Sequence, residues 1–264
     1  MVCIAVMGPS EQSEAIVLRT RAYGESDKIV TLLTAAVGKL TGIAKGAKNS
    51  RRRFANCLDP FTRVHLHYRT RAGASLAFMD SCDLLDPPGV LSEPMKFAYG
   101  SYLLELVDQL TIEGQPVPDL YGLLADALDT LRGGPATAGF LRVFELRLLY
   151  HTGYAPQLRA CGRCRAPLQG AERAFLDPAH ADVVCVRCSA TGTNAALLPV
   201  AGPTLLALDG LRNVPLRDAR SRTLSGTAAG DAAQFMGRLL AAHLPRPLRS
   251  VKLIAALTST PAVG

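Results

Sequence analysis

The chain has 264 residues, of which 48% are hydrophobic and 19% are charged, and its formal net charge is +7. This is the composition of an ordinary globular protein with room for one to three domains, which excludes a low-complexity or repeat protein. Seven cysteines in a chain of this length do not form a secreted disulfide framework. No uncharged run is suited to crossing a membrane. We therefore expect a protein of the reducing cytoplasm with no membrane partner.

The positive charge is concentrated near the N-terminus. Residues 13–71 contain twelve Lys and Arg against four acidic residues, a net charge of +8, whereas residues 72–264 sum to zero. Because the excess belongs to one segment, that segment is expected to meet a polyanion.

The first third of the chain has the pattern of a β-structure. Residues 1–12 are predicted to be a loose leader, and residues 61–68 alternate with period two. Strands are predicted at residues 15–18, 28–33, 40–47, 61–68 and 74–85. Five short strands in about seventy residues favour a small closed barrel, because closure removes exposed edges.

Beyond Pro88 the hydrophobic period changes to 3.6, which indicates helices. Helices are predicted at residues 94–110, 118–131, 140–149, 203–211 and 231–244. Their apolar stripes are interpreted as core packing. The resulting domain assignment is an extension (1–12), a barrel (13–86), a helical part (87–155), a cysteine module (156–194) and a second helical part with a tail (195–264).

Residues 38–54 carry six cations and no anion. Gly42 and Gly46 would let the backbone lie close to a partner, and Phe54 and Phe61 would offer rings for base stacking. The six cations are Lys39, Lys45, Lys48, Arg51, Arg52 and Arg53. A solvated basic loop is the alternative, but the remainder of the chain favours a surface for single-stranded nucleic acid.

Two Cys-x-x-Cys pairs lie twenty residues apart, Cys161 with Cys164 and Cys185 with Cys188. Four thiolates from two tight turns predict one structural Zn²⁺, with disulfides or free thiols as the alternatives. The flanking arginines are expected to offset the charge of the thiolates; they are Arg159, Arg163, Arg165 and Arg187. The other three cysteines, Cys3, Cys57 and Cys82, are interpreted as small buried hydrophobes.

The other polar residues predict no catalytic site. His65 and His67 share one face of a strand, where a half-solvated surface is favoured over a metal pair. The sequence has no phosphate-binding loop, nucleophile elbow or His-Glu-x-x-His helix. We therefore expect a protein that is not an enzyme.

In combination, several motifs resemble one family. Residues 14–30 are EAIVLRTRAYGESDKIV, residues 44–47 are AKGA, residues 50–54 are SRRRF and residues 243–250 are HLPRPLRS. Together with Gly38-Lys39-Leu40 and the four cysteines, they resemble the bacterial recombination mediator family RecO over about residues 13–253.

The resemblance implies an α+β multidomain protein with an N-terminal OB-fold, a helical body and an inserted zinc element. It implies a non-enzymatic, nucleoid-associated DNA repair protein that binds single- and double-stranded DNA and anneals complementary strands. With RecR, such a protein helps to load the recombinase onto DNA coated with single-stranded-DNA-binding protein. The DNA-binding role passes to the six cations of residues 38–54 and, less directly, to Arg19, Arg21 and Lys28. A zinc-knuckle RNA-binding or ribosome-associated module is the alternative.

The resemblance also implies recognition of the acidic, apolar-tipped C-terminal tail of single-stranded-DNA-binding protein. We expect the tail to bind the helical body, where arginines lie beside apolar residues. One candidate group is Arg132, Arg142 and Arg147 beside Phe140, Phe144 and Leu148, and the other is Arg238, Arg246 and Arg249 beside Leu239 and Leu244.

Overall fold

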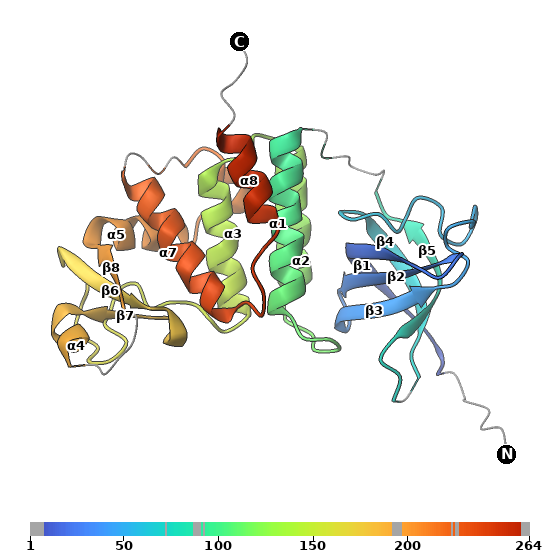
Figure 1. Cartoon of the computed structure of the whole chain (residues 1–264), viewed down its shortest axis with the longest axis horizontal. Helices are drawn as coiled ribbons and strands as arrows, with labels where there is room; N and C mark the ends of the chain where they lie inside the picture. The colour runs from blue at the N-terminus through green and yellow to red at the C-terminus, as the bar shows by residue number, and fades with distance from the viewer. Residues whose placement is uncertain are drawn as a thin grey trace, which may run out of the picture. The chain divides into compact units, whose positions relative to one another are not determined.

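A computed structural model describes most of the chain, namely residues 8–71, 73–86, 91, 93–191, 197–222, 224 and 227–259. The chain divides into two compact units, Met1–Leu128 with Ser250–Gly264, and Asp129–Arg249. The barrel belongs to the first unit together with its first helices, and a three-stranded sheet belongs to the second (Figure 1). The finer domain boundaries drawn from the sequence stay a prediction. No helix among the described residues is both long and apolar enough to cross a bilayer.

The first unit contains the predicted five-stranded barrel. Its strands are β1 (Ser10–Tyr23), β2 (Asp27–Thr34), β3 (Gly38–Ala44), β4 (Arg63–Arg69) and β5 (Ala77–Leu84). The strand order is β1-β2-β3-β5-β4, and β1 closes the barrel by pairing with β4. Only β3 and β5 run parallel. This is an OB-like barrel, and it confirms the expected fold class.

Strand β1 is longer than the sequence predicted, because it serves two neighbours. Residues 10–16 pair with β4 and residues 15–23 pair with β2, with an irregularity in register between Val17 and Arg19. Such a bulge bends a strand and lets it turn from one partner to the next. Since β1 begins at Ser10 and the Gly8 N–H donates to the Thr70 carbonyl at 3.0 Å, the predicted leader ends early. Residues 1–7 lie outside the described part.

The barrel core follows from the alternation in each strand. In β4, Val64, Leu66 and Tyr68 are buried and the residues between them are half-buried, which confirms the period of two. The core also takes in Phe54, which is buried, from the connection between β3 and β4. Burial of this ring anchors the basic connection to the barrel.

Cys57 and Cys82 are joined by a disulfide, so their interpretation as separate small hydrophobes is wrong. The bond links the end of the basic connection to β5, and both residues are buried. A backbone hydrogen bond of 2.9 Å from Cys82 N–H to the Arg53 carbonyl lies beside it. The basic connection is thus attached to β5 by a covalent bond and by a hydrogen bond.

Removing this disulfide is expected to destabilise the barrel. Because the bond closes a loop over a sequence separation of 25, a Cys57→Ser, Cys82→Ser chain should lose about 3 kcal/mol of unfolding free energy through the freer unfolded state. Denaturant titration without reductant measures this loss. The control is the wild-type chain after reduction, which should approach the variant. Equal stability of the oxidised, reduced and mutated chains would contradict the expected role.

The helices of the first unit follow the barrel and return at the chain's end. They are α1 (Pro94–Leu110), the start of α2 (Leu120–Arg132) and α8 (Ser250–Ser259), which packs along α1 (Figure 1). The Glu105 carboxylate on α1 accepts hydrogen bonds from the Ser250 N–H at 2.9 Å and its hydroxyl at 2.6 Å. These bonds satisfy a free donor at the start of α8. The sequence pattern had not predicted this helix.

The second unit combines helices with a small sheet. Its sheet has the order β7-β6-β8, from β6 (Arg173–Asp177), β7 (Asp182–Cys185) and β8 (Leu198–Ala201). Helices α3 (Ala138–His151), α5 (Gly202–Leu211) and α7 (Thr227–His243) form its body and confirm three predicted helices. The shorter elements are the 3₁₀ turn η1 (Pro178–His180), α4 (Val186–Ala190) and α6 (Leu216–Ala219).

Burial in α3 and α7 corrects the predicted tail-binding groups. Phe140, Phe144, Leu148 and Leu239 are fully buried, so they cannot form an open apolar groove. Arg142 is buried as well and pairs with Glu145 at 2.6 Å. These residues are core packing of the second unit.

Candidate functional site

The basic connection between β3 and β4 is fastened to the turn between β1 and β2. The Lys48 ammonium donates to the Gly24 carbonyl at 2.8 Å, and the Lys48 N–H donates to the Ser26 carbonyl at 2.9 Å. From the other side, Asp27 accepts the Gly46 N–H at 2.8 Å. Two cation-bearing segments that are distant in the sequence therefore form one surface at this end of the barrel.

Asp27, which bonds to the basic connection, is an ionised carboxylate. The backbone N–H of Gly46 and the hydroxyl of Ser26 lower the pKa of the Asp27 carboxyl, and the charges of Lys45 and Lys48 lower it further. A carboxylate that accepts such bonds stays ionised at neutral pH. The loop is thus held in shape by one ionised acid.

Most of the predicted DNA-binding cations are exposed on or beside this loop. Arg53 donates to the Lys45 carbonyl at 2.9 Å and lies 5.2 Å from the centre of the Phe54 ring. The exposed members are Lys45, Lys48, Arg51, Arg52, Arg53 and, on β1, Arg21. Lys28, at the start of β2, is half-buried. We call this group of seven cations the loop surface.

The aromatic residues beside the loop surface differ from those the sequence indicated. Phe54 is buried, so the expectation that its ring stacks on bases is wrong. Phe61 packs edge-on against Phe97, with 5.5 Å between the ring centres. Tyr23, at the end of β1, is 53% exposed, and Phe78 on β5 lies 5.5 Å from the Lys45 ammonium. The sequence identifies Tyr23 and Phe78 as aromatic residues. Their position beside the cations could not be predicted, because it depends on the closure of the barrel.

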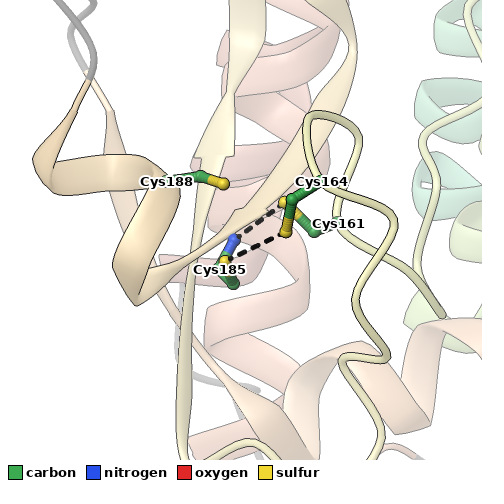
Figure 2. A group of neighbouring side chains, drawn as sticks. All are labelled: Cys161, Cys164, Cys185 and Cys188. Carbon is green, nitrogen blue, oxygen red and sulfur yellow. Dashed lines mark hydrogen bonds between the residues drawn. The ribbon is translucent and has the colours of Figure 1, made fainter.

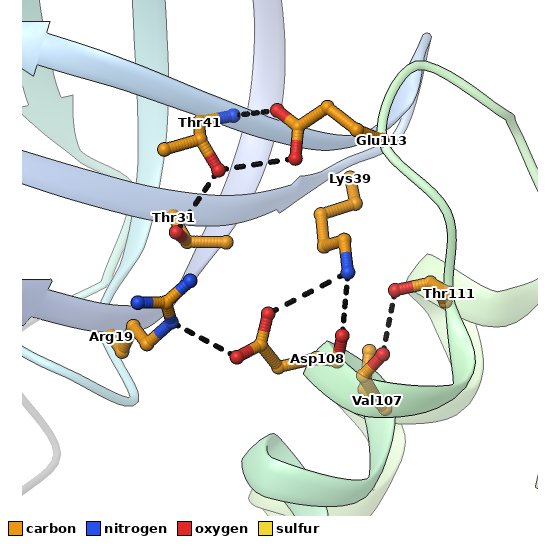
Figure 3. Close-up of polar contacts among 8 residues, drawn as sticks. All are labelled: Arg19, Thr31, Lys39, Thr41, Val107, Asp108, Thr111 and Glu113. Atoms are coloured by element: carbon orange, nitrogen blue, oxygen red, sulfur yellow. Dashed lines mark hydrogen bonds and ion pairs between the residues drawn. The ribbon is translucent and has the colours of Figure 1, made fainter. Parts of the chain in front are cut away.

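Lys39 and Arg19, in contrast, both contact one acid of α1. Arg19 donates to the Asp108 carboxylate at 2.9 Å, and the Lys39 ammonium lies 3.7 Å from the other carboxylate oxygen (Figure 3). The ammonium also donates to the Asp108 backbone carbonyl at 2.5 Å, and the Lys39 side chain is only 14% exposed. The single charge of Asp108 is thus shared between the two cations, of which Lys39 is the more enclosed and Arg19 stays half-exposed.

The segment after α1 also covers part of β3. Glu113 accepts hydrogen bonds from the Thr41 N–H and, at 3.1 Å, from its hydroxyl, which in turn contacts the Thr31 hydroxyl of β2 (Figure 3). Gly38 has φ +74°, and a Cβ there would collide with the Gln115 carbonyl. In OB-folds the face of strands 2 and 3 commonly receives oligonucleotides. Here acids of the same chain occupy part of that face, which leaves the loop surface as the accessible basic region.

In the second unit the four predicted cysteines come together. Cys161 and Cys164 lie on a tight turn in which Arg165 has φ +61°, whereas Cys185 ends β7 and Cys188 lies on α4 (Figure 2). The Gly162 N–H donates to the Val183 carbonyl at 2.9 Å, which joins the turn to the sheet. All four sulfur atoms lie within 4.8 Å of one another.

This cluster fits a tetrahedral metal. Zn–S bonds of about 2.3 Å place neighbouring sulfurs of a tetrahedron about 3.8 Å apart, and the Cys164 and Cys185 sulfurs are 3.7 Å apart. The Cys185 N–H points at the Cys161 sulfur at 3.4 Å, a bond that favours a thiolate (Figure 2). Among the described residues it is the only group of three or more suitable side chains that could hold a metal ion.

The protonation of the cluster is uneven. A hydrogen bond from the Ala166 backbone, with help from neighbouring thiols, lowers the pKa of Cys164 to about 6. The hydrogen bond between Cys188 and Cys164, together with burial, raises the pKa of Cys188 to about 12. The pKa values of Cys164 and Cys188 are thus moved in opposite directions, because neighbouring sulfurs cannot all carry charge at this distance; a bound cation would offset the charge of the thiolates.

The flanking arginines divide into different roles. Arg187 hydrogen-bonds to Cys164, and this bond and the thiolate charges raise the pKa of Arg187, in agreement with the predicted charge balance. Arg163 instead pairs with the buried Asp177 at 3.2 Å, and Arg159 pairs with Asp209 at 2.8 Å. Arg165 is exposed.

Three of the histidines make contacts with residues other than the four cysteines. His180 pairs with Asp177 at 3.1 Å, outside the cysteine cluster. On β4, the His65 and His67 rings meet edge to face at 5.0 Å, and His65 contacts Gln12 at 3.3 Å. They form the half-solvated strand face that the sequence favoured.

Comparison with protein families assigns nearly all of the chain. A family model described as "Recombination protein O N terminal" matches residues 7–88, and one described as "Recombination protein O C terminal" matches residues 91–252. The chain belongs to the RecO family. The first match spans the barrel, and the second spans the helices and the cysteine cluster.

Curated relatives agree with this RecO assignment over nearly their full length. A protein named "DNA repair protein RecO" from Syntrophus aciditrophicus is 33% identical, covering 93% of this chain and 95% of the relative. Proteins of the same name are 38% identical in Anaeromyxobacter sp. strain K, covering 90% and 93%, and 34% identical in Pelobacter propionicus, covering 94% and 98%. Membership of the RecO family places the chain among DNA repair and recombination proteins.

Proposed function

We propose that this chain is a recombination mediator that binds single- and double-stranded DNA and anneals complementary strands without making or breaking a bond. With RecR, it would load the recombinase onto DNA coated with single-stranded-DNA-binding protein. The loop surface is the single observation that best supports this proposal. It gathers seven cations, six of them exposed, beside the exposed ring of Tyr23 and the half-buried ring of Phe78.

The proposed chemistry is the lowering of an electrostatic barrier. Two complementary strands repel each other through their phosphates, and a basic surface that holds both reduces that repulsion. Rings beside the cations stack on bases of any sequence, which suits a protein that must act at many sites. Base pairing then drives the product, so the mechanism needs no nucleophile, nucleotide or redox group.

Annealing of complementary strands coated with single-stranded-DNA-binding protein tests the proposal. We expect the chain to accelerate duplex formation on coated strands, and RecR to permit recombinase loading afterwards. Matched DNA and RNA oligonucleotides decide the alternative. Preferential binding of RNA, with no annealing of coated DNA, would favour an RNA-binding module and would remove the proposed function.

We propose that the cysteine cluster holds one Zn²⁺ in a structural role. The fit of the sulfur spacing to a tetrahedron supports this. Cys161, Cys164, Cys185 and Cys188 would all be ligands, and the ion would tie the turn at Cys161 to β7 and α4. With four sulfur ligands, no position remains for a catalytic water.

We propose the second unit as the receptor of the acidic tail of single-stranded-DNA-binding protein. Burial of Phe140 and Phe144 excludes the groove first expected, but Arg238 on α7 is exposed. An Arg238→Glu chain should bind a labelled tail peptide several-fold more weakly, because an attractive charge becomes repulsive. Fluorescence anisotropy with the full chain measures this. A Lys45→Glu, Arg52→Glu chain is the control; loss of tail binding there instead would assign the tail to the barrel.

We propose a cytoplasmic, nucleoid-associated location, where the DNA substrate is found. A disulfide is uncommon in a reducing compartment. Both Cys57 and Cys82 are buried, which keeps soluble reductants away while the barrel stays folded. Intact-mass measurement of protein from growing cells, alkylated on lysis, would show whether this bond is present there.

A further inference from the structure

The second unit contains a pocket of about 700 Å³ that neither the loop surface nor the cysteine cluster accounts for. It lies where α3 and α5 end. Its lining includes Arg147, Tyr150, His151, Arg159, Asp209 and Arg212. Its volume is within the range of small-ligand sites in proteins, about 300–1,000 Å³.

The pocket has an excess of positive charge. Among the described residues that line it, Asp209 is the one acidic side chain, and it is shared by Arg159 at 2.8 Å and Arg212 at 3.9 Å. Arg147 donates to the uncharged Val214 carbonyl at 2.8 Å, and it has no carboxylate partner among the described residues. Three guanidinium groups against one carboxylate leave two positive charges for a ligand.

The guanidinium groups also determine the sign of the electrostatic potential in the pocket. Helix α3 ends at His151 and α5 ends at Leu211, and the carbonyl ends of helices carry partial negative charge. Without the arginines this place would repel an anion. Binding of a phosphate here must therefore depend on Arg147 and Arg212, since Arg159 is the closer partner of Asp209.

An exposed aromatic ring completes the site. Tyr150 is 68% exposed and meets the His151 ring edge to face at 5.6 Å between centres. Of the lining residues in the described part of the chain, Leu146 alone is aliphatic, so an apolar peptide tip would find little surface. A flat ring beside guanidinium groups matches a nucleotide, whose base stacks and whose phosphate carries charge.

We propose that this pocket binds one nucleotide of single-stranded DNA, with the base stacked on Tyr150 and a phosphate held by Arg147 and Arg212. The inference rests on the proposed DNA binding and adds a second contact in the other unit. A strand long enough to use both contacts gains affinity through a higher effective concentration, without a tighter barrel.

The test uses the full chain and an oligothymidylate that carries one 5-iodouracil. Irradiation should crosslink Tyr150, and peptide mass spectrometry identifies the site. In anisotropy titrations, Tyr150→Ala should weaken binding about tenfold, the scale of one lost base stack, whereas Tyr150→Phe should retain binding. Arg212→Ala should reduce the log–log salt slope by about 0.7. Arg217→Ala, an exposed arginine of the same unit outside the pocket lining, should match the wild type.

The outcomes separate this inference from the proposed function. Strong DNA binding by the wild type, unchanged in Tyr150→Ala and without a Tyr150 crosslink, would overturn the pocket and leave the barrel's role intact. Absence of any single-strand binding by the wild type would remove both. An acidic peptide that binds in a Tyr150-dependent way, with DNA binding unaffected, would overturn the nucleotide assignment and identify a peptide site.

Discussion

Replacing Cys188 with alanine is expected to abolish metal binding and to unfold the cysteine module locally. Apparent zinc affinities of structural sites are about 10–16 kcal/mol in small zinc-binding peptides, and there this energy is folding energy. Here Cys161 and Cys164 lie on a turn, whereas Cys185 and Cys188 lie at the junction of β7 with α4. Without the ion, the turn is joined to β7 and α4 by a few hydrogen bonds, among them those from the Gly162 N–H to the Val183 carbonyl and from Arg163 to the Cys188 carbonyl.

Elemental analysis and hydrogen exchange measure the two parts of this prediction. Metal content should fall from one Zn²⁺ per chain to near zero, and amides of β6 and β7 should exchange faster while those of the barrel do not. Ser189→Ala is the matched control, since Ser189 lies on the same short helix and its hydroxyl donates only to the Val186 carbonyl, at 2.7 Å. Wild-type protein purified without chelator that contains no zinc would contradict the metal assignment. Unchanged exchange in a metal-free variant would show that the ion is not structural.

The barrel and the gathering of the four cysteines could be predicted from the sequence, because both depend on local sequence patterns. The alternation of β4 and the spacing of the two Cys-x-x-Cys pairs need no knowledge of distant residues. The small sheet was missed for a related reason. Its strands β7 and β8 have only four residues each, too few to show a period.

Contacts between residues that are far apart in the chain could not be predicted from the sequence. Lys39 belongs to a run of cations, yet it meets Asp108 across 69 positions of the chain, and Arg19 meets the same acid across 89. Likewise, Phe54 looked available for stacking, but the basic connection turns its ring into the core. Charge and aromatic type were correctly recognised, whereas the availability of each side chain is set by closure of the barrel and by the segment after α1.

Of the six cations in residues 38–54, five are exposed to solvent. The sixth, Lys39, is paired with Asp108. Reversing two of the exposed ones, in a Lys45→Glu, Arg52→Glu chain, should therefore remove two attractive charges from the loop surface and add two repulsive ones. Each phosphate contact contributes a slope of about −0.7 in a log–log plot of affinity against salt for single strands. Two lost contacts should flatten that slope by about 1.4 and weaken binding on the order of a hundredfold at 50 mM salt.

A matched variant separates a local surface from total charge. Arg217→Glu with Lys252→Glu changes the net charge equally, at two exposed positions outside the barrel. Its affinity should stay within about threefold of the wild type, because neither side chain belongs to the loop surface and isolated exposed charges are screened by salt. Anisotropy titrations at several salt concentrations with unrelated sequences compare the three proteins. Equal weakening by both double variants would mean that DNA senses only the net charge. Wild-type affinity and slope in Lys45→Glu, Arg52→Glu would reduce the loop surface to a solvated loop.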